Sequence, residues 1–264
     1  MSTPPRSSRI VAVTSGKGGV GKTFVAANLA AALAKAGRRV LVMDADLGLA
    51  NLDIVLGLVP GATLHEVLMD TARLDDVILQ APGGFSVLPA GSGLMEYSRL
   101  TGELGERLRK VLTELGGRYE YLLLDTGAGI ADTVLYITSL ADEILIVTTP
   151  EPTAMADAYA TIKVLAAQQR RTTLHMVLNQ LGRSGEGRTL VTQLQQVVDR
   201  FLNTAGGPPV KLSFLGEIPA DPAVVQAIRK RRLLLEHAPA SAVARALTGI
   251  ARTLDRLPSL TRAA

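Results

Sequence analysis

Residues 16–23 read Gly-Lys-Gly-Gly-Val-Gly-Lys-Thr and match the pattern G-x-x-x-x-G-K-[ST] at every fixed position. An apolar, β-branched run over 10–14 precedes them, and a helical pattern over 23–36 follows them. A strand that leads through such a loop into a helix is the context in which the pattern binds phosphate. The alternative is a glycine-rich turn whose threonine only caps the helix. We predict a phosphate-binding loop for a nucleotide.

The loop and the start of the following helix supply the predicted nucleotide contacts. Successive glycine N–H groups converge on phosphate oxygens, and the helix N-terminus adds a favourable dipole. In such loops the lysine before the threonine, Lys22, binds the β- and γ-phosphates, and the hydroxyl of Thr23 ligates Mg²⁺. The predicted nucleotide-binding residues of this segment are Gly16, Lys17, Gly18, Gly19, Val20, Gly21, Lys22, Thr23 and Phe24.

Outward from the loop, short apolar runs alternate with longer helical patterns. Runs that predict strands lie at 10–14, 40–43, 85–88, 121–124, 144–148, 174–178 and 212–215. Helical patterns lie at 23–36, 104–115, 154–167, 188–201, 224–229 and 242–257. The strand runs do not alternate between apolar and polar residues, which is typical of parallel strands buried on both faces. The predicted fold class is therefore α/β, a doubly wound and mainly parallel sheet with helices on both faces.

Length and composition limit the other possibilities. The 264 residues predict a single domain over 1–264, with a flexible segment at 1–9 and a short tail at 258–264. Cysteine is absent, which excludes disulfides, thiolate catalysis and cysteine-ligated zinc or iron–sulfur sites. The formal net charge of +4 permits contact with anionic surfaces without requiring it.

The ends of the chain and its apolar runs predict the location. Residues 1–9 lack the pattern of a secretory signal. No apolar run approaches the roughly 18–20 residues of a membrane-spanning helix. We expect a cytoplasmic protein, and peripheral contact with the inner face of the cell membrane is left open.

Three aspartates follow predicted strands. Asp44 and Asp46 end the second strand run, and Asp125 ends the run at 121–124 and precedes Thr-Gly-Ala-Gly. The carboxyl ends of parallel strands form the edge of the sheet at which ligands bind in open α/β folds. A carboxylate there can orient an attacking water or hold Mg²⁺ through its water shell. We predict that Thr23, Asp46 and Asp125 form the magnesium site, with Asp44 as a secondary candidate; alternatively, the first two aspartates cap the next turn.

A second lysine at the start of the loop, Lys17, gives Lys-Gly-Gly-Val-Gly-Lys-Thr. With this loop and the aspartates above, the chain resembles the MinD/ParA family of ATPases over nearly its whole length. The resemblance implies hydrolysis of ATP with Mg²⁺ by two subunits that join face to face around the nucleotide. It implies that Lys17 reaches the phosphates of the partner's ATP and that Asp46 positions the attacking water. Lys17, Lys22 and Asp46 are therefore the catalytic candidates; the alternative for Lys17 is a solvated loop lysine.

Two later segments resemble the base pocket of the family. Residues 177–179, Val-Leu-Asn, end a predicted strand in an amide that can pair with the edge of adenine. Residues 217–221, Glu-Ile-Pro-Ala-Asp, follow the last strand, where family members enclose the purine and ribose. The resemblance implies nucleotide contacts from Asn179, Pro219 and Asp221. Asn179 alone could instead be a turn residue, and Asp221 before a proline could be a helix N-cap.

Within the family, residues 46–51, 125–130 and 149–153 look most like the flagellar-number regulator branch, of the FlhG or FleN type. This branch implies control of flagellar number and placement, with a flagellar GTPase or a transcription or assembly factor as partner. Its members often carry an N-terminal extension that activates the GTPase. The segment before residue 10 has no helical pattern, which puts that activity in doubt. The rivals are a partition-type ATPase that binds nonspecific DNA and a MinD-like regulator of the division site.

Two features near the C-terminus could allow binding to a membrane or to DNA. One face of the helical pattern at 242–257 carries the apolar residues Val243, Leu247, Ile250, Leu254 and Leu257. We expect this face to pack on the core and membrane contact to be weak at most, because the remaining tail is short and has no aromatic residue. The basic run at 229–232 favours a solvated helix end over a DNA-binding surface.

Overall fold

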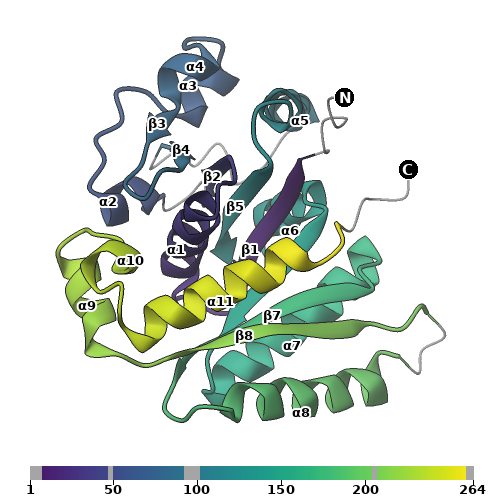
Figure 1. Ribbon diagram of the computed structural model, residues 1–264. Helices are drawn as coiled ribbons and strands as arrows, with labels where there is room; N and C mark the ends of the chain where they lie inside the picture. Colours follow the sequence, from purple (N-terminus) through teal and green to yellow (C-terminus); the bar gives the residue numbers. More distant parts are fainter. Residues whose placement is uncertain (1–7, 47–49, 92–101, 204–206, 260–264) are drawn as a thin grey trace, which may run out of the picture.

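The computed structural model describes residues 8–46, 50–91, 102–203 and 207–259. Its strands form one eight-stranded sheet in the order β3-β4-β2-β5-β1-β6-β7-β8 (Figure 1). All neighbouring pairs are parallel except β3 with β4 at one edge. The strands are β1 (Arg9–Ser15), β2 (Val40–Ala45), β3 (Leu79–Gln80), β4 (Ser86–Leu88), β5 (Tyr121–Ala128), β6 (Glu143–Thr148), β7 (Thr173–Leu181) and β8 (Lys211–Pro219).

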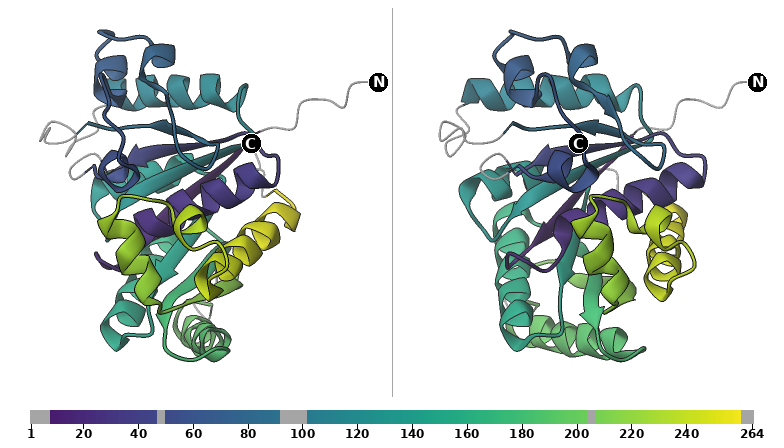
Figure 2. Two further views of the ribbon diagram at one scale, coloured as in Figure 1. Left: turned by 60° about the vertical axis from the view of Figure 1, so that its left-hand side comes forward. Right: turned by 90° about the vertical axis from the view of Figure 1, so that its left-hand side faces the viewer.

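Helices cover both faces of this sheet (Figure 2). One apolar cluster joins α1, α10 and α11 to one face, and two others join α5, α6, α7 and α8 to the opposite face. The prediction of a doubly wound, mainly parallel α/β fold is confirmed. The helices are α1 (Lys22–Lys35), α2 (Leu52–Leu56), α3 (Leu64–Leu68), α4 (Leu74–Val77), α5 (Gly102–Gly116), α6 (Asp132–Leu140), α7 (Pro152–Gln169), α8 (Glu186–Phe201), α9 (Pro222–Arg229), α10 (Leu234–His237) and α11 (Ala242–Arg256).

Helix α11 packs on the core, as its apolar face predicts. It lies between α1 and β8 and contacts both (Figure 1). Val243, Leu247 and Leu254 have no exposed surface, and Leu257 is partly buried against the same cluster. In the part of the chain that the structure describes, no helix is both long enough and apolar enough to cross a membrane.

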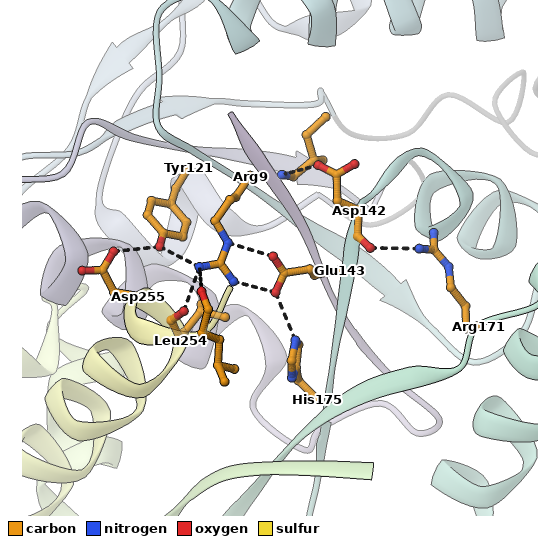
Figure 3. Close-up of polar contacts among 10 residues, drawn as sticks. Arg9, Tyr121, Asp142, Glu143, Arg171, His175, Leu254 and Asp255 are labelled. Carbon is orange, nitrogen blue, oxygen red and sulfur yellow. Dashed lines mark hydrogen bonds and ion pairs between the residues drawn. The ribbon is translucent and has the colours of Figure 1, made fainter. Parts of the chain in front are cut away.

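A buried ionic cluster fixes the last turn of α11 to the sheet (Figure 3). Arg9 donates two hydrogen bonds of 2.7 Å to the carboxylate of Glu143, and His175 contacts the same carboxylate at 3.0 Å. The Nη1 group of Arg9 also donates to the carbonyl oxygens of Leu254 at 2.8 Å and Leu257 at 3.1 Å. One arginine therefore joins β1, β6 and the C-terminal end of α11.

Candidate functional site

The phosphate loop connects β1 to α1 at the carboxyl edge of the sheet. Gly19 and Gly21 have φ angles of 81° and 91°, a left-handed conformation that favours glycine. Gly16 has no room for a side chain, since a Cβ there would lie 2.3 Å from the carbonyl carbon of Asp157 in α7. The loop backbone is thus held close to α7, and its N–H groups lead into the N-terminus of α1, as a phosphate site requires.

Asp125 on β5 lies beside the start of α1. Its side chain is 1% exposed, and the hydroxyl of Thr23 hydrogen-bonds to it. Burial raises the pKa of Asp125 to about 6, although the charge of Lys22 lowers it. Its Oδ1 atom is buried without a hydrogen-bond partner among the described residues. A buried carboxylate oxygen with no donor, next to a threonine hydroxyl, suits the water shell of Mg²⁺.

Asp46 lies one residue beyond the end of β2 and faces the segment that follows Asp125. A Cβ placed on Gly127 would be 3.4 Å from its Oδ1 atom. Its negative charge contributes to the raised pKa of Asp125, which also places the two carboxylates near each other. The structure therefore brings Lys22, Thr23, Asp46 and Asp125 together. Residues 47–49 of the segment 46–51, on which part of the family resemblance rests, lie outside the described residues.

Asp44, the secondary magnesium candidate, has a different environment. It is 1% exposed and accepts backbone hydrogen bonds from Asp46, Asn51 and Leu52. Burial raises its pKa to about 7, the charge of Asp125 adds to this effect, and the three N–H groups oppose it. Both of its oxygens thus already have donors, unlike Oδ1 of Asp125.

Lys17 points toward the N-terminus of α7. Its ammonium lies 3.0 Å from Oε2 of Glu151 and 3.1 Å from the hydroxyl of Thr153. The side chain of Lys17 is 41% exposed, and that of Glu151 is 62% exposed. Sequence reasoning assigned no contact to Glu151 or Thr153; their only signal was their place in the segment 149–153.

Asn179 on β7 contacts the phosphate loop near its C-terminal end, whereas Lys17 lies near its start. Its Nδ2 atom donates to the carbonyl oxygen of Val20 at 2.8 Å, and its Oδ1 atom accepts from the N–H of Gln180 at 2.9 Å. The side chain is buried, and each of its two polar atoms keeps one further hydrogen-bonding position.

Two predicted nucleotide contacts remain, Pro219 and Asp221. Pro219 ends β8 beside the end of β7, so it lies at the same carboxyl edge of the sheet as Asn179. Asp221 is the N-cap of α9 and accepts from the N–H of Ala223 at 2.8 Å. The side chains of Val20 and Phe24 are buried in the core, which leaves their backbone groups for a ligand.

Proteins of similar sequence are known for most of this chain. The model of the CobQ/CobB/MinD/ParA nucleotide binding domain matches residues 11–234. The antiactivator FleN of Pseudomonas aeruginosa is 41% identical over 250 residues, which cover 95% of this chain and 87% of FleN. The flagellum site-determining protein YlxH of Helicobacter pylori is 34% identical over 94% of this chain and 82% of its own length.

A solved structure of similar fold holds a nucleotide. The septum site-determining protein MinD of Pyrococcus horikoshii, complexed with Mg-ADP, superimposes with a TM-score of 0.75 and 29% identity. The match covers 94% of this chain and 96% of that one. The similarity therefore extends over nearly the whole chain.

Proposed function

Because this chain belongs to the CobQ/CobB/MinD/ParA nucleotide-binding family, we propose that it is an Mg²⁺-dependent ATPase. The proposal rests on the meeting of Lys22, Thr23, Asp46 and Asp125 at one edge of the sheet. The loop N–H groups and Lys22 bind the phosphates of ATP, and Asp46 orients the attacking water. Thr23 and Asp125 hold Mg²⁺, which when bound offsets the charge of the phosphates.

The assignment of the loop is tested by Lys22→Ala. This change removes the positive charge from the β- and γ-phosphates, so calorimetry should show a large loss of Mg²⁺-ATP affinity. Lys35→Ala, at the exposed C-terminal end of the same helix, is the matched control and should bind ATP as the wild type does. An unchanged affinity in Lys22→Ala would reject the assignment.

The same proposal includes an ATP-dependent homodimer. Lys17 is partly exposed at the edge where we propose that the phosphates bind, and its partners Glu151 and Thr153 belong to the same chain. In the dimer, Lys17 exchanges these contacts for the phosphates of the nucleotide in the other subunit. Hydrolysis removes the charge that Lys17 binds, and the subunits separate.

We propose that the protein acts in the cytoplasm and that its biological role is to control the number and placement of flagella. The similarity to FleN over 95% of this chain, together with that to YlxH, supports it. Its partners are a flagellar GTPase or a transcription or assembly factor, which distinguish the ATP dimer from the monomer. Cells that lack the protein should show an altered number or position of flagella in electron micrographs. The wild-type gene should restore the pattern and Lys22→Ala should not.

One observation favours a second role, binding of nonspecific DNA as in partition ATPases. Residues 229–232, Arg-Lys-Arg-Arg, are all exposed at the end of α9 and beyond it. DNA bound by such a cluster would have an affinity that falls steeply with salt. ATP-dependent binding to random duplex with that salt dependence would support this role, and its absence would leave the flagellar role.

A further inference from the structure

We propose that Asp44 is a positioning residue that holds Asp46 in place for catalysis by binding backbone N–H groups both of Asp46 and of the start of α2. The inference rests on the proposed ATPase activity. It assigns to Asp44 a role other than the magnesium ligation that its place in the sequence predicts.

The contacts of one carboxylate carry this inference. Oδ1 of Asp44 accepts from the N–H of Asp46 at 3.1 Å. Oδ2 accepts from the N–H groups of Asn51 and Leu52, both at 3.0 Å. Asn51 is the N-cap of α2 and Leu52 is its first residue, so Asp44 links the start of that helix to the backbone of Asp46.

The contacts act on Asp46 through its backbone. Asp46 lies one residue beyond the end of β2. Its N–H bond to the buried carboxylate of Asp44 fixes the backbone from which its side chain extends toward Gly127. Because an error of about 1 Å in a reacting group can lower a rate by about a hundredfold, this orientation matters more for turnover than for ATP binding.

A comparison with Asp125 separates positioning from metal binding. Asp44 and Asp125 are directly paired across β2 and β5, and both are 1% exposed. Oδ1 of Asp125 has no hydrogen-bond partner among the described residues, whereas both oxygens of Asp44 accept from backbone N–H groups. The two neighbouring carboxylates thus have different roles: that of Asp125 is available to the proposed metal ion, and that of Asp44 binds backbone N–H groups.

The test compares Asp44→Asn with Asp125→Asn in steady-state ATP hydrolysis. The amide introduced by Asp44→Asn keeps the shape of the carboxylate but has only one accepting oxygen, so one set of N–H bonds is lost. We expect kcat to fall at least about tenfold, with KM for ATP and the Mg²⁺ concentration for half-maximal rate within about twofold of wild type. Asp125→Asn should instead raise the Mg²⁺ requirement. An increase of the Mg²⁺ requirement in Asp44→Asn, with kcat restored at high Mg²⁺, would overturn the inference, as would an unchanged kcat.

A second measurement does not depend on the variant's folding. The first N–H groups of a helix have no partner within the helix. In the wild type, hydrogen exchange at Asn51 and Leu52 should nevertheless be at least about tenfold slower than in a free peptide, because a buried carboxylate accepts from them. Exchange at the free-peptide rate would contradict the proposed contacts. A wild type that exchanges slowly but hydrolyses no ATP would contradict the proposed function instead.

Discussion

Asn179 donates a hydrogen bond of 2.8 Å to the carbonyl oxygen of Val20, 159 positions earlier in the chain. Its Nδ2 atom also lies against Gly21, where a Cβ would come within 2.4 Å. The amide thus joins the end of β7 to the last turn of the phosphate loop. A residue predicted to contact the base thus also supports the loop that we propose binds the phosphates.

The first prediction follows from this double position. Asn179→Ala should weaken binding of ATP and also of inorganic tripolyphosphate, because the loop loses its support. Asp221→Ser keeps a helix N-cap but removes the carboxylate, so it should weaken only ATP. Calorimetry with both ligands provides the comparison. Unchanged tripolyphosphate affinity in Asn179→Ala would restrict Asn179 to the base.

The second prediction concerns the cluster of Figure 3. Glu143→Gln leaves the guanidinium of Arg9, whose side chain is 9% exposed, without the anionic partner that it contacts at 2.7 Å. Removal of one partner of a buried ion pair costs roughly 3–5 kcal/mol, which urea unfolding would detect. Glu103→Gln breaks the exposed pair with Arg107 and should leave the unfolding midpoint unchanged. Equal effects of the two substitutions would show that the buried cluster does not stabilise the fold.

The third prediction concerns pH. Burial raises the pKa of Asp44 to about 7 and of Asp125 to about 6. An aspartate in the unfolded chain has a pKa of about 3.9. At a pH between this value and the raised pKa values of the folded state, the unfolded chain has therefore released protons that the folded chain keeps. Their contribution to stability is therefore greatest below about pH 4 and falls as the pH rises through about 7. The melting temperature of the nucleotide-free protein should fall from about pH 5 to 8, and fall less in Asp44→Asn. Identical slopes would reject the raised values.

The fourth prediction concerns α11. Four of its five predicted apolar positions are at most 2% exposed, and burial of one such side chain contributes roughly 1.5–3 kcal/mol. Loss of the helix threatens a domain whose stability is about 5–15 kcal/mol. Truncation after Ala240 should give insoluble or unfolded protein, whereas truncation after Leu257 should preserve ATPase activity. A soluble, active protein ending at Ala240 that no longer binds liposomes with ATP would place the helix on the membrane.

The sequence predicted the parts of this fold that have a local signal. Its seven strand runs correspond to β1, β2 and β4–β8, because buried parallel strands are continuous apolar stretches. It missed β3, which has two residues, and α2–α4 and α10, which have four or five each. It also missed α6, Asp132–Leu140, whose sequence DTVLYITSL is rich in β-branched residues and becomes helical through packing on β5 and β1.

The same distinction holds at the site. The phosphate loop is contiguous, so its pattern could be read directly. The bond from Asn179 to Val20 and that from Lys17 to Glu151 join segments 159 and 134 positions apart. Such pairs depend on strand order, which puts β7 beside β6 and β6 beside β1. The role of Asp44 likewise appears only when its three donors are located.

Light scattering with Mg²⁺-ATP tests the central claim, a dimer formed through Lys17 and opened by hydrolysis at Asp46. Asp46→Ala should remain an ATP-bound dimer, because the attacking water is no longer oriented. Lys17→Ala should remain a monomer that still binds ATP through Lys22 and hydrolyses none. The account would be contradicted if both variants had the same mass, or if the wild type were active while monomeric.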